Sequence, residues 1–175
     1  MYFLFEVIGI IGRFMEAGGN VLWLIAAVTF AMWTLVFERF WYFRFSLSGD
    51  IDRAIATWEA RSERKSWNAK QMRRRLVSES RERIHQNLPM IKTLVALCPL
   101  LGLLGTVTGM IEVFNIMAVT GGGDARQMAG GVSRATIPTM AGMVAAISGV
   151  FANTYVTRIA TRETELLQDH LTTDH

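Results

Sequence analysis

The chain has 175 residues, a formal net charge of +3 and a composition that is 51% hydrophobic. Its apolar residues lie in long blocks, which indicates a membrane protein rather than a soluble domain. The single cysteine, Cys98, excludes an intrachain disulfide, and the three histidines share no metal-ligand spacing, so we expect no metal site. The sequence shows no nucleophile–base pair or cofactor fingerprint, so we expect neither a cofactor nor an enzymatic activity.

Residues 1–18 are predicted to form a short amphipathic helix. Its apolar side consists of Tyr2, Phe5, Ile8 and Phe14. The charges within it leave too short an apolar run to cross a bilayer, so we expect it to lie in the periplasmic interface plane. The first residues contain no basic region, so we do not expect a cleaved secretory signal. The sequence Gly18-Gly19-Asn20 is predicted to break the helix.

Residues 19–44 are predicted to form the first transmembrane helix. Its apolar run ends at Glu38-Arg39, and an aromatic cluster follows at residues 40–43. Aromatic rings gather at membrane boundaries, and Lys and Arg favour the cytoplasmic side, so we expect this end to be cytoplasmic. The helix is bulky and carries few small or polar residues, so we expect it to face lipid on the outside of an assembly.

Residues 45–88 are predicted to form a cytoplasmic helical domain, with a first helix that begins near Ser48. The apolar residues that define its two helices are Ile51, Ile55 and Trp58 in the first and Leu76, Val77, Ile84 and Leu88 in the second. The domain is rich in Lys and Arg, but acidic residues interrupt them and membrane spans bracket it, so we expect no nucleic-acid partner. The run Arg73-Arg74-Arg75 is either a contact for acidic lipid head groups or a solvated basic face.

Residues 89–118 are predicted to form the second transmembrane helix, because about 20 apolar residues at ~1.5 Å each cross a hydrocarbon core of roughly 30 Å. One face of this helix is small and slightly polar, with Pro99, Gly102, Thr106, Gly109 and Val113. Small residues let a neighbouring helix approach closely. Thr106 lies near the middle of this face, and Thr106 and Glu112 are costly at membrane depth unless they face a partner or water.

Residues 119–127 are predicted to form a periplasmic loop, and residues 128–160 the third transmembrane helix. The loop glycines, residues 121–123, lack the Lys and Ser/Thr that follow in a phosphate-binding loop, so we expect no nucleotide site. The third helix carries a second small stripe of Ala135, Thr139, Gly142, Ala146 and Gly149. Pro138 frees backbone carbonyls that hydroxyls or water must satisfy. Residues 161–175 are predicted to be a cytoplasmic tail.

Two charged residues interrupt the second and third predicted spans. If Thr106 and Thr139 lie at one depth in antiparallel helices, Glu112 lies ~9 Å outward from the first and Arg134 ~7.5 Å outward from the second. We hypothesise that Glu112 and Arg134 pair, within or between subunits, because an unpaired charge there is expensive. The alternative is that each side chain reaches the outer interface separately.

These features together predict an all-α integral membrane protein with three transmembrane helices and long cytoplasmic helical extensions. The N-terminus is expected to be periplasmic and the C-terminus cytoplasmic. One chain has too few helices to enclose a pore, so the two small stripes predict a homo-oligomeric ring with the stripes facing inward. A threonine hydroxyl does not ionise near neutral pH, so a carboxylate that carries a proton must come from a partner or from Glu112.

Both stripes lie in a longer pattern that resembles the ExbB/TolQ/MotA proton-channel family. The matching residues are Pro99-Leu100-Leu101-Gly102-Leu103-Leu104-Gly105-Thr106-Val107-Thr108-Gly109-Met110-Ile111 with Phe114, and Gly131-Val132-Ser133 with Ala135, Thr139, Gly142 and Ala146-Ile147. The short length and three spans resemble ExbB more than the four-span MotA. The chain departs from the family at Arg134, where long ExbB proteins place a glutamate, and at Ser148, where the family has a proline.

The resemblance implies a multi-pass homopentamer in the bacterial inner membrane, around the single spans of an ExbD-like dimer whose aspartate carries the proton. It further implies that a TonB-like protein couples the proton-motive force to outer-membrane active transport. Thr106 and Thr139 match the family threonines that face this aspartate. The resemblance also assigns a set of small residues to pore lining or to packing against the partner helix: Gly102, Gly105, Gly109, Ala135, Gly142 and Ala146.

Three other functions compete with this one. A TolQ-like subunit of an envelope-maintenance motor would share the same motifs. A non-conducting membrane scaffold would use the small stripes only for helix packing. In that case Thr106→Ala and Thr139→Ala would have almost no effect on the protein. A self-sufficient channel would use Glu112 as its own proton carrier.

Overall fold

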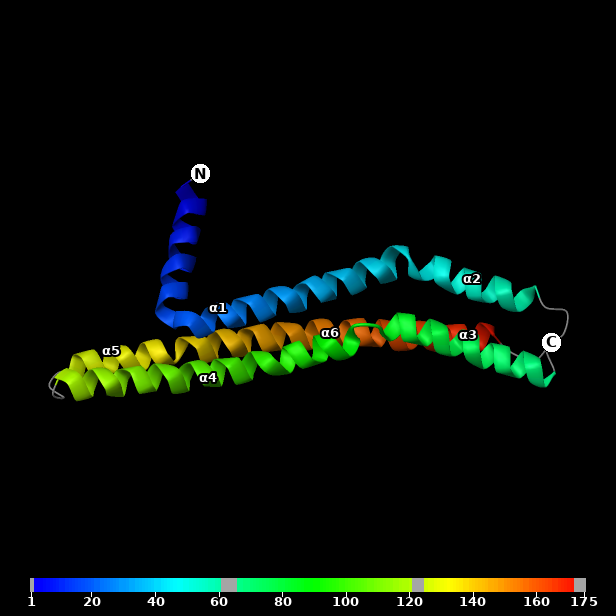
Figure 1. The fold of residues 1–175 in the computed structure, drawn as a ribbon. Helices are drawn as coiled ribbons and strands as arrows, with labels where there is room; N and C mark the ends of the chain where they lie inside the picture. The colour runs from blue at the N-terminus through cyan, green and yellow to red at the C-terminus, as the bar shows by residue number, and fades with distance from the viewer. Residues whose placement is uncertain (1, 61–65, 121–124, 172–175) are drawn as a thin grey trace. The chain divides into compact units, whose positions relative to one another are not determined.

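The computed structural model describes residues 2–60, 66–120 and 125–171, without the side chains of residues 2–5, 7, 8, 10, 17, 59, 120, 125 and 127. Six helices make up this described part, and no strand occurs in it (Figure 1). They are α1 (Tyr2–Phe45), α2 (Leu47–Glu59), α3 (Trp67–His85), α4 (Leu88–Thr120), α5 (Ala125–Ala135) and α6 (Ile137–His170).

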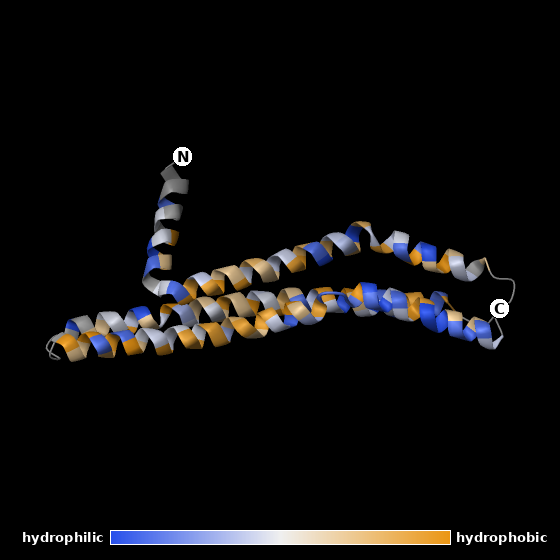
Figure 2. Ribbon diagram, in the orientation of Figure 1, coloured by the Kyte–Doolittle hydropathy of each residue, from blue (hydrophilic) through white to orange (hydrophobic). Residues whose placement is uncertain are grey.

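Three described segments are long and apolar enough to cross a membrane. They are Gly18–Phe45, Trp67–Val119 and Met128–His170. Figure 2 shows long hydrophobic stretches on α1, α4 and α6 and mainly hydrophilic colouring on α3. The sequence-based prediction of an all-helical membrane protein with three spans is therefore confirmed, while the direction of insertion and the ring of subunits stay predictions.

The helices divide into two compact units, which consist of residues 1–32 with 93–150 and of residues 33–92 with 151–175. In the first unit, α1 packs against α4 and α6 through one face. Leu22, Ile25 and Met32 are buried on this face. The opposite face of α1 leaves large apolar side chains such as Trp23 and Phe30 exposed. This one-sided burial is compatible with the expectation that the first span faces lipid.

Gly19 interrupts α1 inside the predicted Gly18-Gly19-Asn20 break. Its backbone has φ 63° and ψ −164°, a conformation that glycine adopts without the steric cost of a Cβ. Figure 1 shows the N-terminal segment turning away from the rest of α1 at this point. The predicted apolar side of the N-terminal segment falls on Tyr2, Phe5 and Ile8, whose side chains lie outside the described residues.

The third predicted span consists of two helices, because α5 ends at Ala135 and α6 begins at Ile137. Pro138 is the second residue of α6, where its missing N–H costs little. In a continuous helix its ring would clash with the carbonyl of Arg134, which explains the interruption at Thr136. The predicted glycine loop, residues 121–123, and residues 172–175 of the predicted tail lie outside the described residues.

The second unit has its own apolar core, which joins α2, α3 and the end of α6. Its buried members are Ala54, Trp58, Ala69, Leu167 and Leu171, with Ile51, Ile55, Leu76 and Val77 packed against them. The predicted apolar periods of both helices therefore meet in one core. The first of these helices, α2, begins at Leu47, one residue before the predicted start near Ser48, and the Ser46 side chain that precedes it makes no capping hydrogen bond.

Candidate functional site

Within the first unit, α4 and α6 approach so closely that glycine is required at the contact. A Cβ on Gly102 would lie 2.9 Å from the Cα of Thr139, and a Cβ on Gly142 would lie 3.2 Å from the Cα of Gly102. Real Cβ atoms essentially never lie within 3.0 Å of such atoms, and a Cβ on Gly142 would also come closer than this to the carbonyl oxygen of Cys98, so either substitution would force the helices apart.

The same contact continues toward α5 and the kink of α1. A Cβ on Gly109 would lie 2.8 Å from the Cβ of Ala135, and a Cβ on Gly105 would collide with the ring of Pro138. The two predicted small stripes therefore pack against each other within one chain. Their predicted packing against a partner helix, and the packing role of Ala146 toward such a helix, stay predictions; Ala146 itself is buried in a cluster with Cys98 and Ala145.

The two threonines singled out by the sequence both donate their hydroxyl protons to backbone carbonyls, and Thr139 does so across the contact between α4 and α6. Thr139 Oγ1 donates across the contact to the carbonyl oxygen of Gly102 at 2.8 Å. Thr106 Oγ1 donates within its own helix to the carbonyl oxygen of Leu103 at 2.7 Å. Each hydroxyl oxygen therefore keeps lone pairs that can accept a hydrogen bond from another group.

Glu112 and Arg134 lie in a groove of about 510 Å³ that neither Thr106 nor Thr139 lines. The polar and charged residues of this groove, which we call the kink groove, are Glu16, Asn20, Thr108, Glu112 and Arg134. Thr106 and Thr108 point about 200° apart around α4, since each residue turns a helix by about 100°. The hydroxyl of Thr106 and the charges are thus on different sides of α4.

The hypothesised ion pair between Glu112 and Arg134 stays a prediction. Both side chains are exposed and line the kink groove, but no ion pair between them occurs among the described residues. The structure therefore brings the two residues to one groove without joining their charged ends. It adds a third charge, Glu16, that sequence spacing did not connect with them, because its place depends on the kink at Gly19.

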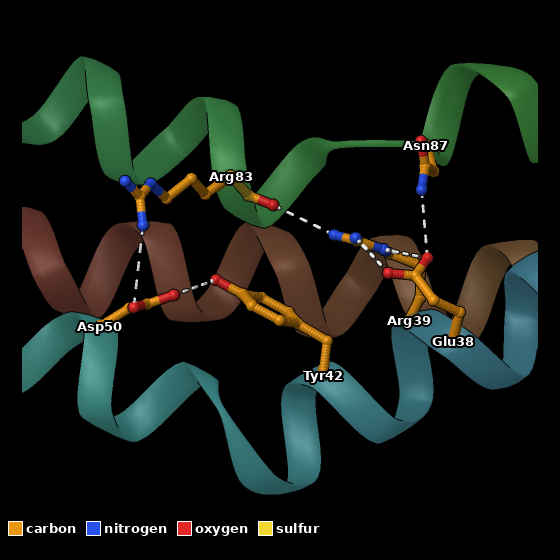
Figure 3. A network of polar contacts seen from close by, with 6 residues as sticks. All are labelled: Glu38, Arg39, Tyr42, Asp50, Arg83 and Asn87. Carbon is orange, nitrogen blue, oxygen red and sulfur yellow. Dashed lines mark hydrogen bonds and ion pairs between the residues drawn. The ribbon is translucent and has the colours of Figure 1, made fainter.

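The second unit contains a polar cluster that sequence reasoning missed (Figure 3). Its centre is Arg39, which is only 3% exposed and donates to both carboxylate oxygens of Glu38, at 2.6 and 3.0 Å. Arg39 also donates to the carbonyl oxygen of Arg83 at 3.1 Å, and the Asn87 amide donates to Glu38 at 3.1 Å. The sequence suggested only that Arg39 marks the membrane boundary.

The other half of this cluster surrounds Asp50. Tyr42 donates its hydroxyl to Asp50 at 2.8 Å, and Arg53 pairs with the same carboxylate at 2.5 Å. Arg83 approaches Asp50 to 3.9 Å. The cluster thus ties α1, α2 and the junction between α3 and α4 together. The one available sequence signal was an adjacent Glu-Arg pair at the end of an apolar run.

The junction between α3 and α4 depends on Asn87, which has a positive φ of 65°. Asparagine tolerates this left-handed conformation better than most residues. Because Arg39 and Glu38 bind groups on both sides of the junction, they stabilise the break between the two helices.

Arg73 has a different role from the two predicted for its basic run. Its guanidinium donates to the carbonyl oxygens of Leu171 and Gln168 at the end of α6, the latter at 3.1 Å. A cation there satisfies free carbonyls and opposes the negative end of the helix dipole. Arg74 and Arg75 remain exposed, so either prediction still applies to them. Among the described residues no group of three or more His, Cys, Asp or Glu side chains gathers to hold a metal ion.

Parts of the chain are similar in sequence to known proteins. The chain is 52% identical over 61 residues to the ExbB-like protein 1 of Synechocystis sp., and 38% identical over 69 residues to its ExbB-like protein 3. It is 36% identical over 75 residues to biopolymer transport protein exbB1 of Vibrio cholerae. These matches cover 33%, 38% and 42% of this chain, and 24%, 33% and 33% of the relatives' own lengths.

No solved structure gives a significant match to the chain. A family model does match, over residues 47–169, and this range includes the contact between α4 and α6 and both threonines. The resemblance to this family that the two small stripes indicate is thereby confirmed, and the relatives named above are ExbB or ExbB-like proteins. The chain belongs to the MotA/TolQ/ExbB proton channel family.

Proposed function

We propose that this chain is the proton-channel subunit of an ExbB–ExbD–TonB-type complex in the bacterial inner membrane. In this complex a pentamer of the chain surrounds an ExbD-like partner with a single span. The partner's aspartate carries the proton, and a TonB-like protein transmits the energy to outer-membrane transport. Membership of the family and the ExbB-like relatives support this assignment.

The observation that carries the proposal is the state of the two threonine hydroxyls. Both already donate to carbonyl oxygens, of Gly102 and Leu103, so each offers only acceptor lone pairs to a partner. A protonated aspartic acid can donate a hydrogen bond to such an oxygen, whereas an ionised aspartate cannot. The arrangement therefore favours the protonated form of the partner over the ionised form.

This difference in binding is what proton-driven movement requires. A ligand or a proton shifts an equilibrium only by its differential free energy between two states. A proton that moves down a potential of ~100 mV supplies ~2.3 kcal/mol. Residues 93–111 and 135–157 contain no Asp, Glu, Lys or Arg, so the walls near the threonines offer no competing site that ionises strongly.

The test measures proton uptake into liposomes in three preparations: the chain alone, the chain with its single-span partner, and both with the TonB-like protein. We expect flux only when the partner is present. Thr106→Val should abolish that flux and Thr106→Ser should largely retain it, because serine keeps the hydroxyl. If the chain alone gives proton flux and Glu112→Gln abolishes it, Glu112 and not a partner carries the proton.

A non-conducting scaffold is the second candidate, and one observation favours it. The glycines of both stripes and the Thr139 hydroxyl all make contacts within one chain. A scaffold predicts no proton flux in any of the three preparations, and equal assembly of Thr106→Val and the unmodified chain. A TolQ-like role would be recognised by co-purification with envelope-maintenance partners instead of a TonB-like protein.

A further inference from the structure

The kink groove is built from the same end of all three spans. Residues 17–37, 93–111 and 135–157 contain no Asp, Glu, Lys or Arg. Stretches of roughly 20 residues have a length of about 30 Å in a helix, which matches the hydrocarbon thickness of a bilayer. The charges that end these stretches on one side are Glu16, Glu112 and Arg134, and all three line the groove. The groove therefore lies where the hydrocarbon region gives way to lipid head groups.

The groove combines two carboxylates with one guanidinium. Glu16 comes from the N-terminal segment of α1, Glu112 from α4 and Arg134 from α5. Among the described residues no ion pair consumes these charges. A ligand that carries one cationic and one anionic group would match them, because charge-assisted hydrogen bonds to carboxylates and to a guanidinium are the strong ones.

The remaining lining of the groove is partly apolar, through Val21, Val113, Ile116 and Pro138. Its volume of about 510 Å³ is within the range of small-molecule sites, roughly 300–1,000 Å³. Apolar walls beside charged groups, at the level of the head groups, fit a lipid better than a freely soluble ion.

We propose that the kink groove binds the head group of an aminophospholipid such as phosphatidylethanolamine. The primary ammonium donates to Glu16 and Glu112, and the phosphate accepts from Arg134. The proposal goes beyond proton conduction and requires only that the chain is inserted in a membrane.

The lining also argues against phosphatidylcholine. A quaternary ammonium has no N–H to donate and is typically recognised by a cage of aromatic rings. No aromatic residue lines the groove within the described part of the chain. Anionic phosphatidylglycerol would satisfy Arg134 but would leave both carboxylates without a cation. The primary amine is thus the chemical feature that the groove selects.

Gly19 has a specific part in this site. It turns the chain so that Glu16 lies at the groove, and it lines the groove itself with Gly18. A Cβ on Gly18 would collide with the side chain of Leu22, whereas Gly19 is required for its backbone conformation.

The experiment measures lipid binding to the purified, delipidated oligomer by native mass spectrometry, with matched acyl chains throughout. The lipids are phosphatidylethanolamine, its N-methyl and N,N-dimethyl derivatives, phosphatidylcholine and phosphatidylglycerol. We expect affinity to fall along the methylation series, by about tenfold from phosphatidylethanolamine to phosphatidylcholine. This series needs no variant, so a folding defect cannot obscure it.

Three variants then locate the site. Glu16→Gln and Glu112→Gln should each reduce the preference for phosphatidylethanolamine over phosphatidylcholine severalfold. Arg134→Gln should weaken binding of all the phospholipids. The matched controls are Glu6→Gln and Arg126→Gln, which change exposed residues that do not line the groove and should leave binding unchanged.

Equal affinity for phosphatidylethanolamine and phosphatidylcholine would overturn the proposal. A preference that survives Glu16→Gln and Glu112→Gln would also overturn it, as would tighter binding of phosphatidylglycerol. Glycerophosphoethanolamine, which lacks acyl chains, should not compete; competition at concentrations comparable to the lipid would assign the groove to a soluble zwitterion instead. Proton uptake measured on the same preparations reports separately on the proposed function.

Discussion

The hydroxyl of Thr139 donates a 2.8 Å hydrogen bond to the carbonyl of Gly102, across a close contact between α4 and α6. The bond is possible because Gly102 has no side chain to separate the two helices. It also fixes the rotamer of Thr139 and leaves its oxygen as an acceptor. Stability of the helix pair and the proposed interaction with a partner therefore depend on the same atom.

Substitution of Thr139 should affect both roles, and each can be measured separately. Thr139→Val keeps the shape but loses the bond, and should destabilise the protein by about 0.5–1.5 kcal/mol and abolish partner-dependent proton uptake. Thr139→Ser keeps the hydroxyl and should retain most of the uptake. Unfolding in mixed detergent micelles measures the first effect, and liposome assays measure the second. Full uptake by Thr139→Val would remove the residue from the proton path.

Gly102→Ala should be strongly destabilising, because the added Cβ would lie 2.9 Å from the Cα of Thr139. Overpacking of this kind costs about 1–3 kcal/mol. Gly130→Ala is the matched control, since its Cβ would meet nothing within 4 Å. The thermal midpoint of the detergent-solubilised protein should fall for the first variant only. An unchanged midpoint for Gly102→Ala would contradict the close contact.

Gly19→Ala should be destabilising for a different reason, which is backbone conformation. The position has φ 63° and ψ −164°, but nothing lies within 4 Å of an added Cβ, so only this backbone conformation, which is essentially restricted to glycine, disfavours alanine. The expected cost is about 1–3 kcal/mol. Gly12→Ala, in the same segment with equally open space and no positive φ, should be neutral or stabilising because alanine favours helix. The comparison is read from hydrogen exchange of residues near the kink.

Arg39→Gln should loosen the junction between α3 and α4. The substitution removes the donor to Arg83 and the charge partner of Glu38, and we expect a loss of about 1–3 kcal/mol. Glu38 is partly solvated, which limits the penalty. Arg53→Gln is the control, because that arginine is largely exposed and surface ion pairs contribute only about 0–1 kcal/mol. Faster exchange at Gln86–Leu88 in Arg39→Gln alone would support the assignment.

Apolar run length and glycine placement carried most of what the sequence could predict. The three spans follow from uninterrupted apolar residues, and the interruption at Gly19 follows from adjacent glycines. The small stripes correctly marked a close helix contact around Gly102 and Gly142. They could not identify which surface packs against each stripe, because small residues indicate only that another helix can approach closely.

Long-range polar contacts lay beyond the sequence. Arg39 and Arg83 are 44 residues apart, and Asn87 and Glu38 are 49 apart, so no local spacing connects them. Glu16 joins the kink groove only because the chain turns at Gly19, and the direction of that turn is set by tertiary contacts. Helical geometry alone predicts that Thr106 and Glu112 point in different directions around α4. The sequence could not show that Glu112 lies in a groove, because that depends on where α1 and α5 pack.

The intrachain contact between Gly102 and Thr139 has a consequence for biogenesis. Because each copy supplies both partners of this close contact, the helix pair can form in a newly inserted subunit without any other subunit. Larger residues, including Leu103, Phe114 and Val144, are exposed in the single chain and are available to neighbours in the proposed oligomer. If that oligomer forms, we expect folding of the subunit and its recruitment to be separate events, so that a subunit keeps its internal structure while it waits for its partners.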